Sequence, residues 1–123
     1  MIKLTFCLVR LPHLTREAFQ DYWWNTHGPL VASVAETLQI RRYLQFHSLS
    51  AEASAAIRAT RDAPEEYDGV AELWFDSLEA MAANAKRPEA QAAGRTLLED
   101  ERKFIDLPRS PLWLGEERVV VGG

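Results

Sequence analysis

The stretch Gly69-Val70-Ala71-Glu72-Leu73-Trp74-Phe75 is the clearest strand signal in this chain. Its β-branched and aromatic residues favour a strand, and Asp76 or Ser77 behind it is a good cap for a following helix. Leu73 and Trp74 are neighbours, so their side chains point to opposite faces of a sheet. Both faces of this strand are therefore apolar, which predicts a sheet that is covered on both sides.

The N-terminus predicts another strand, because apolar and other residues alternate there with a period of two. The apolar positions are Ile2, Leu4, Phe6 and Leu8. This stretch is short and no small-residue cleavage site follows it before Pro12, so it does not look like a signal peptide. No run of residues reaches the ~20 apolar positions of a membrane span. We therefore expect a cytoplasmic protein in which Cys7 is reduced.

Residues 38–48 predict the second strand in chain order, and its two faces differ. Ile40, Leu44 and Phe46 form its apolar face. The opposite face is polar and carries Arg41, Tyr43, Gln45 and His47. Such a face either lines a wet pocket or is exposed to solvent near the end of the strand.

Helices are expected between these strands. Thr15 is a good N-cap for a helix over 15–25, which we expect His27-Gly28-Pro29 to interrupt before a second segment over 29–37. The Ala-rich residues 50–62 predict a short exposed helix. A further helix is expected from Leu78 to about Lys86, and another begins at Pro88 with Leu97 and Leu98 on its buried side. Trp113 and Leu114 predict the last strand, and Val119–Val121 belong either to that strand or to a tail.

The resulting order reduces to βαββαβ, the ferredoxin-like α+β pattern with a four-stranded antiparallel sheet. We expect a single domain over residues 1–123. Helices cover one face of such a sheet, and a second copy of the chain would cover the other. The apolar character of both faces therefore predicts a homodimer.

Composition excludes several classes of function. The chain has 14 basic and 18 acidic side chains and a net charge of −4. No basic stripe is present, which disfavours nucleic-acid and membrane-surface partners. A single cysteine excludes an internal disulfide framework and a cysteine-based zinc cluster. Two histidines and a carboxylate would suit a non-haem iron, but no single element carries them at metal-ligand spacing. The sequence also has no Walker or dinucleotide glycine pattern, and we expect neither a metal nor another cofactor.

His27 is the most informative polar residue. It lies at the predicted helix break, where the free N–H groups of the next segment would disfavour the imidazolium form. A neutral imidazole can act as a general base or polarise a carbonyl group. The alternative is that His27 only caps the turn.

Glu72 and Trp74 share one face of the strand predicted over residues 69–75. Glu72 either pairs with an arginine such as Arg41 or lies beside an apolar wall, where its pKa would rise as a general acid requires. Asp68 is most simply a turn residue.

These segments together resemble the EthD family, named for a protein of ethyl tert-butyl ether degradation. The specific parts of the resemblance are His27-Gly28-Pro29-Leu30-Val31 and Asp68-Gly69-Val70-Ala71-Glu72-Leu73-Trp74-Phe75. It extends over nearly the whole chain. It implies a dimeric α+β barrel, in which two ferredoxin-like subunits pack their sheets together and a ligand lies between each sheet and its helices.

The resemblance also implies a site. The expected catalytic residues are His27, Tyr43 and His47, and the expected substrate-binding residues are Trp23, Gln45, Asp68, Glu72 and Trp74. A cofactor-independent lyase, dehydratase or isomerase acting on a hydrophobic or aromatic small molecule fits this set. The alternatives are a non-catalytic ligand-binding accessory protein of a degradation operon and a haem-binding barrel.

Overall fold

The computed structural model describes residues 1–123 and contains one four-stranded antiparallel sheet in the order β2-β3-β1-β4. The strands are β1 (Ile2–Leu8), β2 (Arg42–His47), β3 (Gly69–Phe75) and β4 (Leu112–Gly115). The helices are α1 (Arg16–Tyr22), the π-helical turn η1 (Trp23–His27), α2 (Gly28–Leu38), α3 (Ala51–Ala59), α4 (Leu78–Asn84), α5 (Pro88–Glu101) and the short 3₁₀ helix η2 (Leu107–Arg109). This order and pairing confirm the ferredoxin-like α+β fold.

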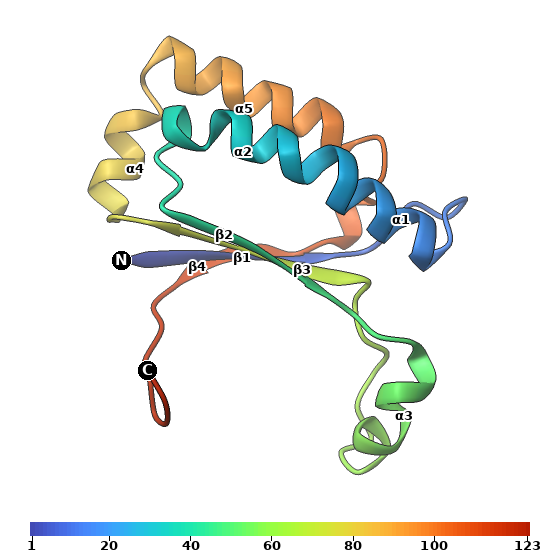
Figure 1. The fold of residues 1–123 in the computed structure, drawn as a ribbon. Helices are drawn as coiled ribbons and strands as arrows, with labels where there is room; N and C mark the ends of the chain where they lie inside the picture. Colours follow the sequence, from blue (N-terminus) through green and yellow to red (C-terminus); the bar gives the residue numbers. More distant parts are fainter.

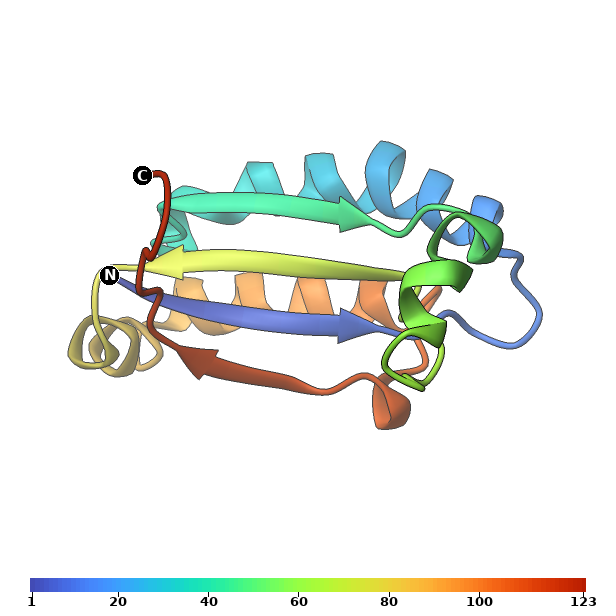
Figure 2. The same ribbon diagram turned by 90° about the horizontal axis from the view of Figure 1, so that it is seen from below.

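The two faces of the sheet have different surroundings. Helices α1, α2, α4 and α5 lie on one side, whereas α3 and the C-terminal end of the chain lie on the other (Figure 1). Leu73 pairs with Leu4 and Tyr43 on the helix side. Trp74, the next residue, points to the side without a helical layer, which faces the viewer in Figure 2 and which we call the open face. The open face carries Lys3, Thr5, Cys7, Arg42, Leu44, Phe46, Val70, Glu72, Trp74 and Trp113.

The first helical stretch corrects one prediction. Thr15 caps α1 as expected and accepts a hydrogen bond from the Ala18 N–H. However, the helix does not break at Pro29, because it passes through η1 without interruption. In this turn the Gly28 N–H bonds to the carbonyl of Trp23, five residues back, as in a π-helix. The wider turn tolerates the missing N–H of Pro29, which therefore lies in the first turn of α2 and does not end the helix.

The predicted apolar face of the second strand is also wrong in part. Ile40 precedes β2 and packs on the helix side with Val31 and Phe75. The strand itself begins only at Arg42, and the N–H of the preceding Arg41 bonds to the Trp74 carbonyl. Leu44 and Phe46 lie on the open face, because the alternation that includes them starts with Arg42 and not with Ile40.

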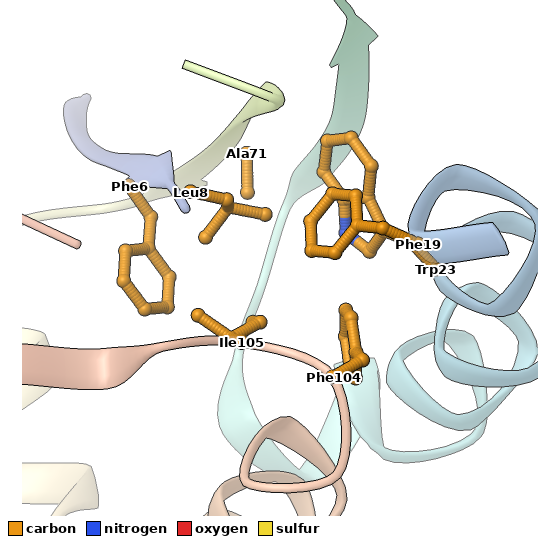
Figure 3. Close-up of a cluster of buried hydrophobic side chains, with 7 residues drawn as sticks. All are labelled: Phe6, Leu8, Phe19, Trp23, Ala71, Phe104 and Ile105. Carbon is orange, nitrogen blue, oxygen red and sulfur yellow. The ribbon is translucent and has the colours of Figure 1, made fainter. Parts of the chain in front are cut away.

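The main hydrophobic core lies between the sheet and α1, η1 and the end of α5. Figure 3 shows the side chains that form it, which are Phe6, Leu8, Phe19, Trp23, Ala71, Phe104 and Ile105. The Phe19 ring lies 5.7 Å from the Trp23 ring and 5.4 Å from the Phe104 ring, measured between centroids. Trp23 is 1% exposed, so it belongs to the helix face that meets the sheet, as its spacing indicates.

The remaining elements lie outside this core. The exposed helix α3 is confirmed and is capped by Ser50, and Ser77 rather than Asp76 caps α4. Leu98, predicted on the buried side of α5, is 38% exposed. The chain leaves the sheet after Gly115, so Val119–Val121 belong to a tail. None of the helices combines the length and the apolar character that crossing a membrane requires.

Candidate active site

A cavity of about 470 Å³ lies between the helical layer and the sheet. Its walls are mostly apolar and come from β1, β3, α2, α4 and α5, and Trp23 of η1 also lines it. The polar side chains that reach it are His27, Tyr43, Asn84, Gln91 and Glu101. No lysine or arginine lines it. A cavity of this size and character suits a small apolar molecule with few polar groups.

His27 is the last residue of η1 and is 5% exposed. Its Nδ1 lies 2.7 Å from Oδ2 of Asp100 on α5. The carboxylate can only accept, so we assign the ring proton to Nδ1, which leaves the Nε2 lone pair free. Burial lowers the pKa of His27, although the hydrogen bond to Asp100 opposes this change. His27 is therefore a neutral base at pH 7, held in one tautomer.

The reason for this low pKa differs from the expected one. The sequence interpretation placed His27 beside the free N–H groups at the start of a new helix. Because the helix is continuous through η1, no such groups face the imidazole. Instead, burial of the side chain away from water lowers the pKa of His27.

Asp100 is itself held by three groups. Its Oδ1 accepts a hydrogen bond of 2.5 Å from the Tyr22 hydroxyl, and Lys103 Nζ lies 3.7 Å away. Burial raises the pKa of Asp100, but hydrogen bonds from Tyr22 and His27 outweigh this effect and keep the pKa below its usual value. Burial and the bond to Asp100 raise the pKa of Tyr22 to about 12. Asp100 is therefore a carboxylate that fixes His27.

Glu101, the next residue, lines the cavity. Burial raises its pKa to about 7, and the negative charge of Asp100 contributes to the rise. Near neutral pH a large fraction of Glu101 is therefore protonated and able to donate a proton. The cavity thus combines a neutral base and a carboxylic acid, the pair that acid–base catalysis requires.

Replacing Glu101 by glutamine is expected to change how stability depends on pH. The folded-state pKa of about 7 lies above the ordinary value of 4.5, so the wild type loses stability as pH rises between these values. The loss amounts to about 2 kcal/mol after allowance for partial exposure. Urea unfolding of Glu101→Gln should show no such loss, so its advantage over the wild type grows from pH 4.5 to pH 8. Glu99→Gln, at an exposed position of α5, is the matched control. An identical slope with pH in wild type and Glu101→Gln would contradict this pKa.

Tyr43, Gln45 and His47 share the helix side of β2, as the alternation predicts. Only Tyr43 reaches the cavity. Gln45 Nε2 donates to the Tyr43 hydroxyl oxygen over 2.8 Å, and Gln45 Oε1 lies 2.8 Å from His47 Nε2. The His47 ring stacks on Trp23, with centroids 4.6 Å apart, and the exposed Trp24 meets it edge-on. Gln45 and His47 therefore lie behind Tyr43 and do not line the cavity.

The other three expected site residues lie elsewhere. Glu72 and Trp74 are on the open face, across the sheet from His27, because the register of β3 places Ala71 and Leu73 on the helix side. Glu72 pairs with Lys3 over 2.8 Å and not with Arg41, which pairs with Asp76. The expectation that they share a pocket with His27 is therefore wrong.

Asp68 is more than a turn residue. It is buried, and its carboxylate accepts hydrogen bonds from the Arg10 guanidinium and backbone N–H and from Arg16. These contacts tie the start of β3 to the turn before α1. Asp68 does not line the cavity.

The sequence interpretation missed the roles of Asp100 and Glu101. A signal was present, because Ala93, Leu97 and Phe104 recur at helical spacing and Asp100 falls on the same stripe. An acid on an apolar helix face is uncommon unless it has a partner. No three His, Cys, Asp or Glu side chains of the chain come together as a metal site would require.

Comparisons with known proteins agree with this fold. The EthD domain model matches residues 11–108. A conidial pigment biosynthesis dehydratase EthD from Metarhizium robertsii is 27% identical over 120 residues, covering 94% of this chain and 81% of that protein.

Two solved structures show the same fold. An ethyl tert-butyl ether degradation (EthD) family protein from Bacillus halodurans superposes with a TM-score of 0.62 at 22% identity, covering 96% of this chain and 99% of the other. A dimeric protein of unknown function with a ferredoxin-like fold, from Bacteroides fragilis, gives a TM-score of 0.58 at 14% identity, with coverage of 94% and 95%. Since the domain model covers most of its length, this chain belongs to the EthD domain family.

Proposed function

We propose that this protein is a small lyase of the dehydratase type that acts on an uncharged, largely apolar molecule without a cofactor. The observation that carries the proposal is the combination of a neutral His27, fixed by Asp100, and a Glu101 with a pKa of about 7 around one apolar cavity. The name of the relative from Metarhizium robertsii supports a dehydration in particular.

The proposed reaction removes water from a β-hydroxy carbonyl compound. His27 Nε2 takes the proton from the carbon beside the carbonyl group, and the released electron pair forms the carbon–carbon double bond. The carbon–oxygen bond of the hydroxyl group breaks, and Glu101 gives its proton to the departing oxygen to form water. Tyr43 donates a hydrogen bond to the carbonyl oxygen, and Trp23 forms an apolar wall.

A naphthyl β-hydroxyketone tests this function, because its conversion to the conjugated enone is followed by absorbance. The wild type should form the enone faster than buffer alone, with a rate that falls above pH 7 as Glu101 loses its proton. Binding of the hydroxyketone without any enone formation would instead support the alternative of a non-catalytic binding protein.

The open face supports a homodimer as the working form. Phe46 and Trp113 are 61% and 53% exposed there, on the two edge strands of the sheet. They share this face with Leu44, Val70 and Trp74, and apolar side chains gathered on one face mark an interaction site. The face is framed by α3 and the C-terminal end of the chain (Figure 1), and the similar protein from Bacteroides fragilis is dimeric. We propose that a second copy packs on this face.

Replacing Phe46 by glutamate should convert the dimer into a monomer at micromolar concentration, because it replaces an exposed aromatic side chain of the proposed interface by a charge that the partner would have to desolvate. Light scattering during size-exclusion chromatography measures the mass. Trp24→Glu, at an equally exposed aromatic on the helical layer, is the control and should leave the dimer intact. A monomeric wild type would contradict the proposed assembly.

A further inference from the structure

Gln45 joins three parts of the candidate site through one side-chain amide. Its Nε2 lies 2.9 Å from the Trp23 carbonyl oxygen and 2.8 Å from the Tyr43 hydroxyl oxygen. Its Oε1 lies 2.8 Å from Nε2 of His47. Both N–H groups and the oxygen of the amide are therefore hydrogen-bonded to groups of the protein.

The donors and acceptors of this network can be assigned without ambiguity. The Trp23 carbonyl can only accept, so the nitrogen end of the amide must face it. The second hydrogen of the same nitrogen points to Tyr43, whose oxygen therefore accepts. Tyr43 donates no hydrogen bond to the protein, which leaves its own hydrogen for the cavity that it lines. Since Oε1 accepts, His47 carries a hydrogen on Nε2.

The π-helical turn makes room for this arrangement. The Trp23 carbonyl accepts from the Gly28 N–H as well as from Gln45. A Cβ atom on Gly28 would lie 3.3 Å from Gln45 Nε2 and 3.4 Å from the Trp23 oxygen, which is a tight fit. The same turn ends in His27. Gln45 therefore connects the strand that carries Tyr43 to the turn that carries the proposed base.

We infer that Gln45 is a positioning residue that fixes the Tyr43 hydroxyl as a hydrogen-bond donor to the carbonyl oxygen of an uncharged ligand, with His47 holding the Gln45 amide. The inference rests on the proposed function for the place of the ligand. The absence of lysine and arginine from the cavity wall makes this hydroxyl well suited to hold a neutral oxygen. A carboxylate ligand would meet no cation there.

Two probes separate the hydrogen bond from general packing. Acetonaphthone carries one carbonyl acceptor, and naphthalene carries none. In the wild type the infrared carbonyl stretch of bound acetonaphthone should lie at lower wavenumber than in an apolar solvent. Tyr43→Phe removes the donor. Gln45→Glu reverses the hydrogen bond between residue 45 and Tyr43, because a carboxylate only accepts and Tyr43 then turns its hydrogen towards the carboxylate.

Both variants should return the carbonyl stretch to its position in apolar solvent. They should also lower the affinity for acetonaphthone about fivefold, which is the effect of losing one neutral hydrogen bond. Their affinity for naphthalene should stay within about twofold of the wild type, since packing is kept. If Gln45→Glu does not fold, as judged by circular dichroism, Gln45→Met takes its place. That variant lets the hydroxyl rotate and should reduce the shift of the stretch.

An unshifted stretch in the wild type, an unchanged stretch in the Gln45 variant that folds, or no binding of acetonaphthone would each overturn the inference. A shifted stretch in a protein that does not dehydrate the hydroxyketone would reject the proposed function and keep the role of Gln45.

Discussion

His27→Gln is expected to slow dehydration of the naphthyl β-hydroxyketone by about 100- to 10,000-fold, the range for loss of a positioned general base. Glutamine keeps a donor for Asp100 and much of the volume, so the variant should fold and bind acetonaphthone with nearly wild-type affinity. The loss should therefore fall on kcat and not on KM. A wild-type kcat in a folded His27→Gln would contradict the assigned base.

Asp100→Asn tests how the base is held. The asparagine amide can donate to Nδ1 of His27, which would move the ring proton to Nε2 and remove the lone pair from the cavity. We expect a loss of about 100-fold in kcat from this change of tautomer. Asp106→Asn is the control, because Asp106 pairs with Arg109 and does not line the cavity. Equal effects of the two substitutions would contradict the positioning role.

Gly69→Ala is expected to give the largest loss of stability from a single added methyl group. A Cβ atom there would lie 2.4 Å from Cζ3 and 2.8 Å from Cη2 of Trp23, and 3.0 Å from the Phe46 carbonyl oxygen. The indole cannot retreat, because Phe19 and His47 pack against it. We expect the free energy of unfolding to fall by about 3 kcal/mol and Tm by about 10 °C.

Gly94→Ala is the matched control for this substitution. Gly94 lies within α5, and no heavy atom lies within 4 Å of a Cβ built there. Alanine should raise the helix propensity and leave the protein as stable as the wild type or up to ~1 kcal/mol more stable. Calorimetry compares the two variants. If the free energies of unfolding of Gly69→Ala and the wild type differ by less than about 0.5 kcal/mol, Trp23 is not packed as described.

Local patterns were enough to predict the strands. Alternation over Ile2–Leu8 and the adjacent apolar residues Leu73 and Trp74 predict a sheet with two apolar faces. This prediction needs no knowledge of tertiary contacts. Alternation does not say which face meets the helices, however. Glu72 and Trp74 were therefore expected beside His27, although the structure places them across the sheet.

The site needed information that no local pattern contains. The partner of His27 is Asp100, 73 residues away, and only the packing of α5 against η1 brings them together. The expected break at Pro29 failed for a related reason. Local rules for proline are sound, but the π-helical turn is supported by Gln45 from a different strand. Helix continuity at this point is a property of the tertiary structure.

The proposed function requires His27 to act as a base towards a carbon acid bound in the apolar cavity. Exchange of the methyl hydrogens of acetonaphthone in deuterium oxide, followed by NMR, tests it most directly, because exchange requires proton removal and no leaving group. The wild type should accelerate exchange over free imidazole at equal concentration, and His27→Gln should lose about 100-fold or more of that rate while still binding the ketone. Bound ketone that exchanges no faster than free ketone, or equal rates in wild type and His27→Gln, would contradict this role of His27.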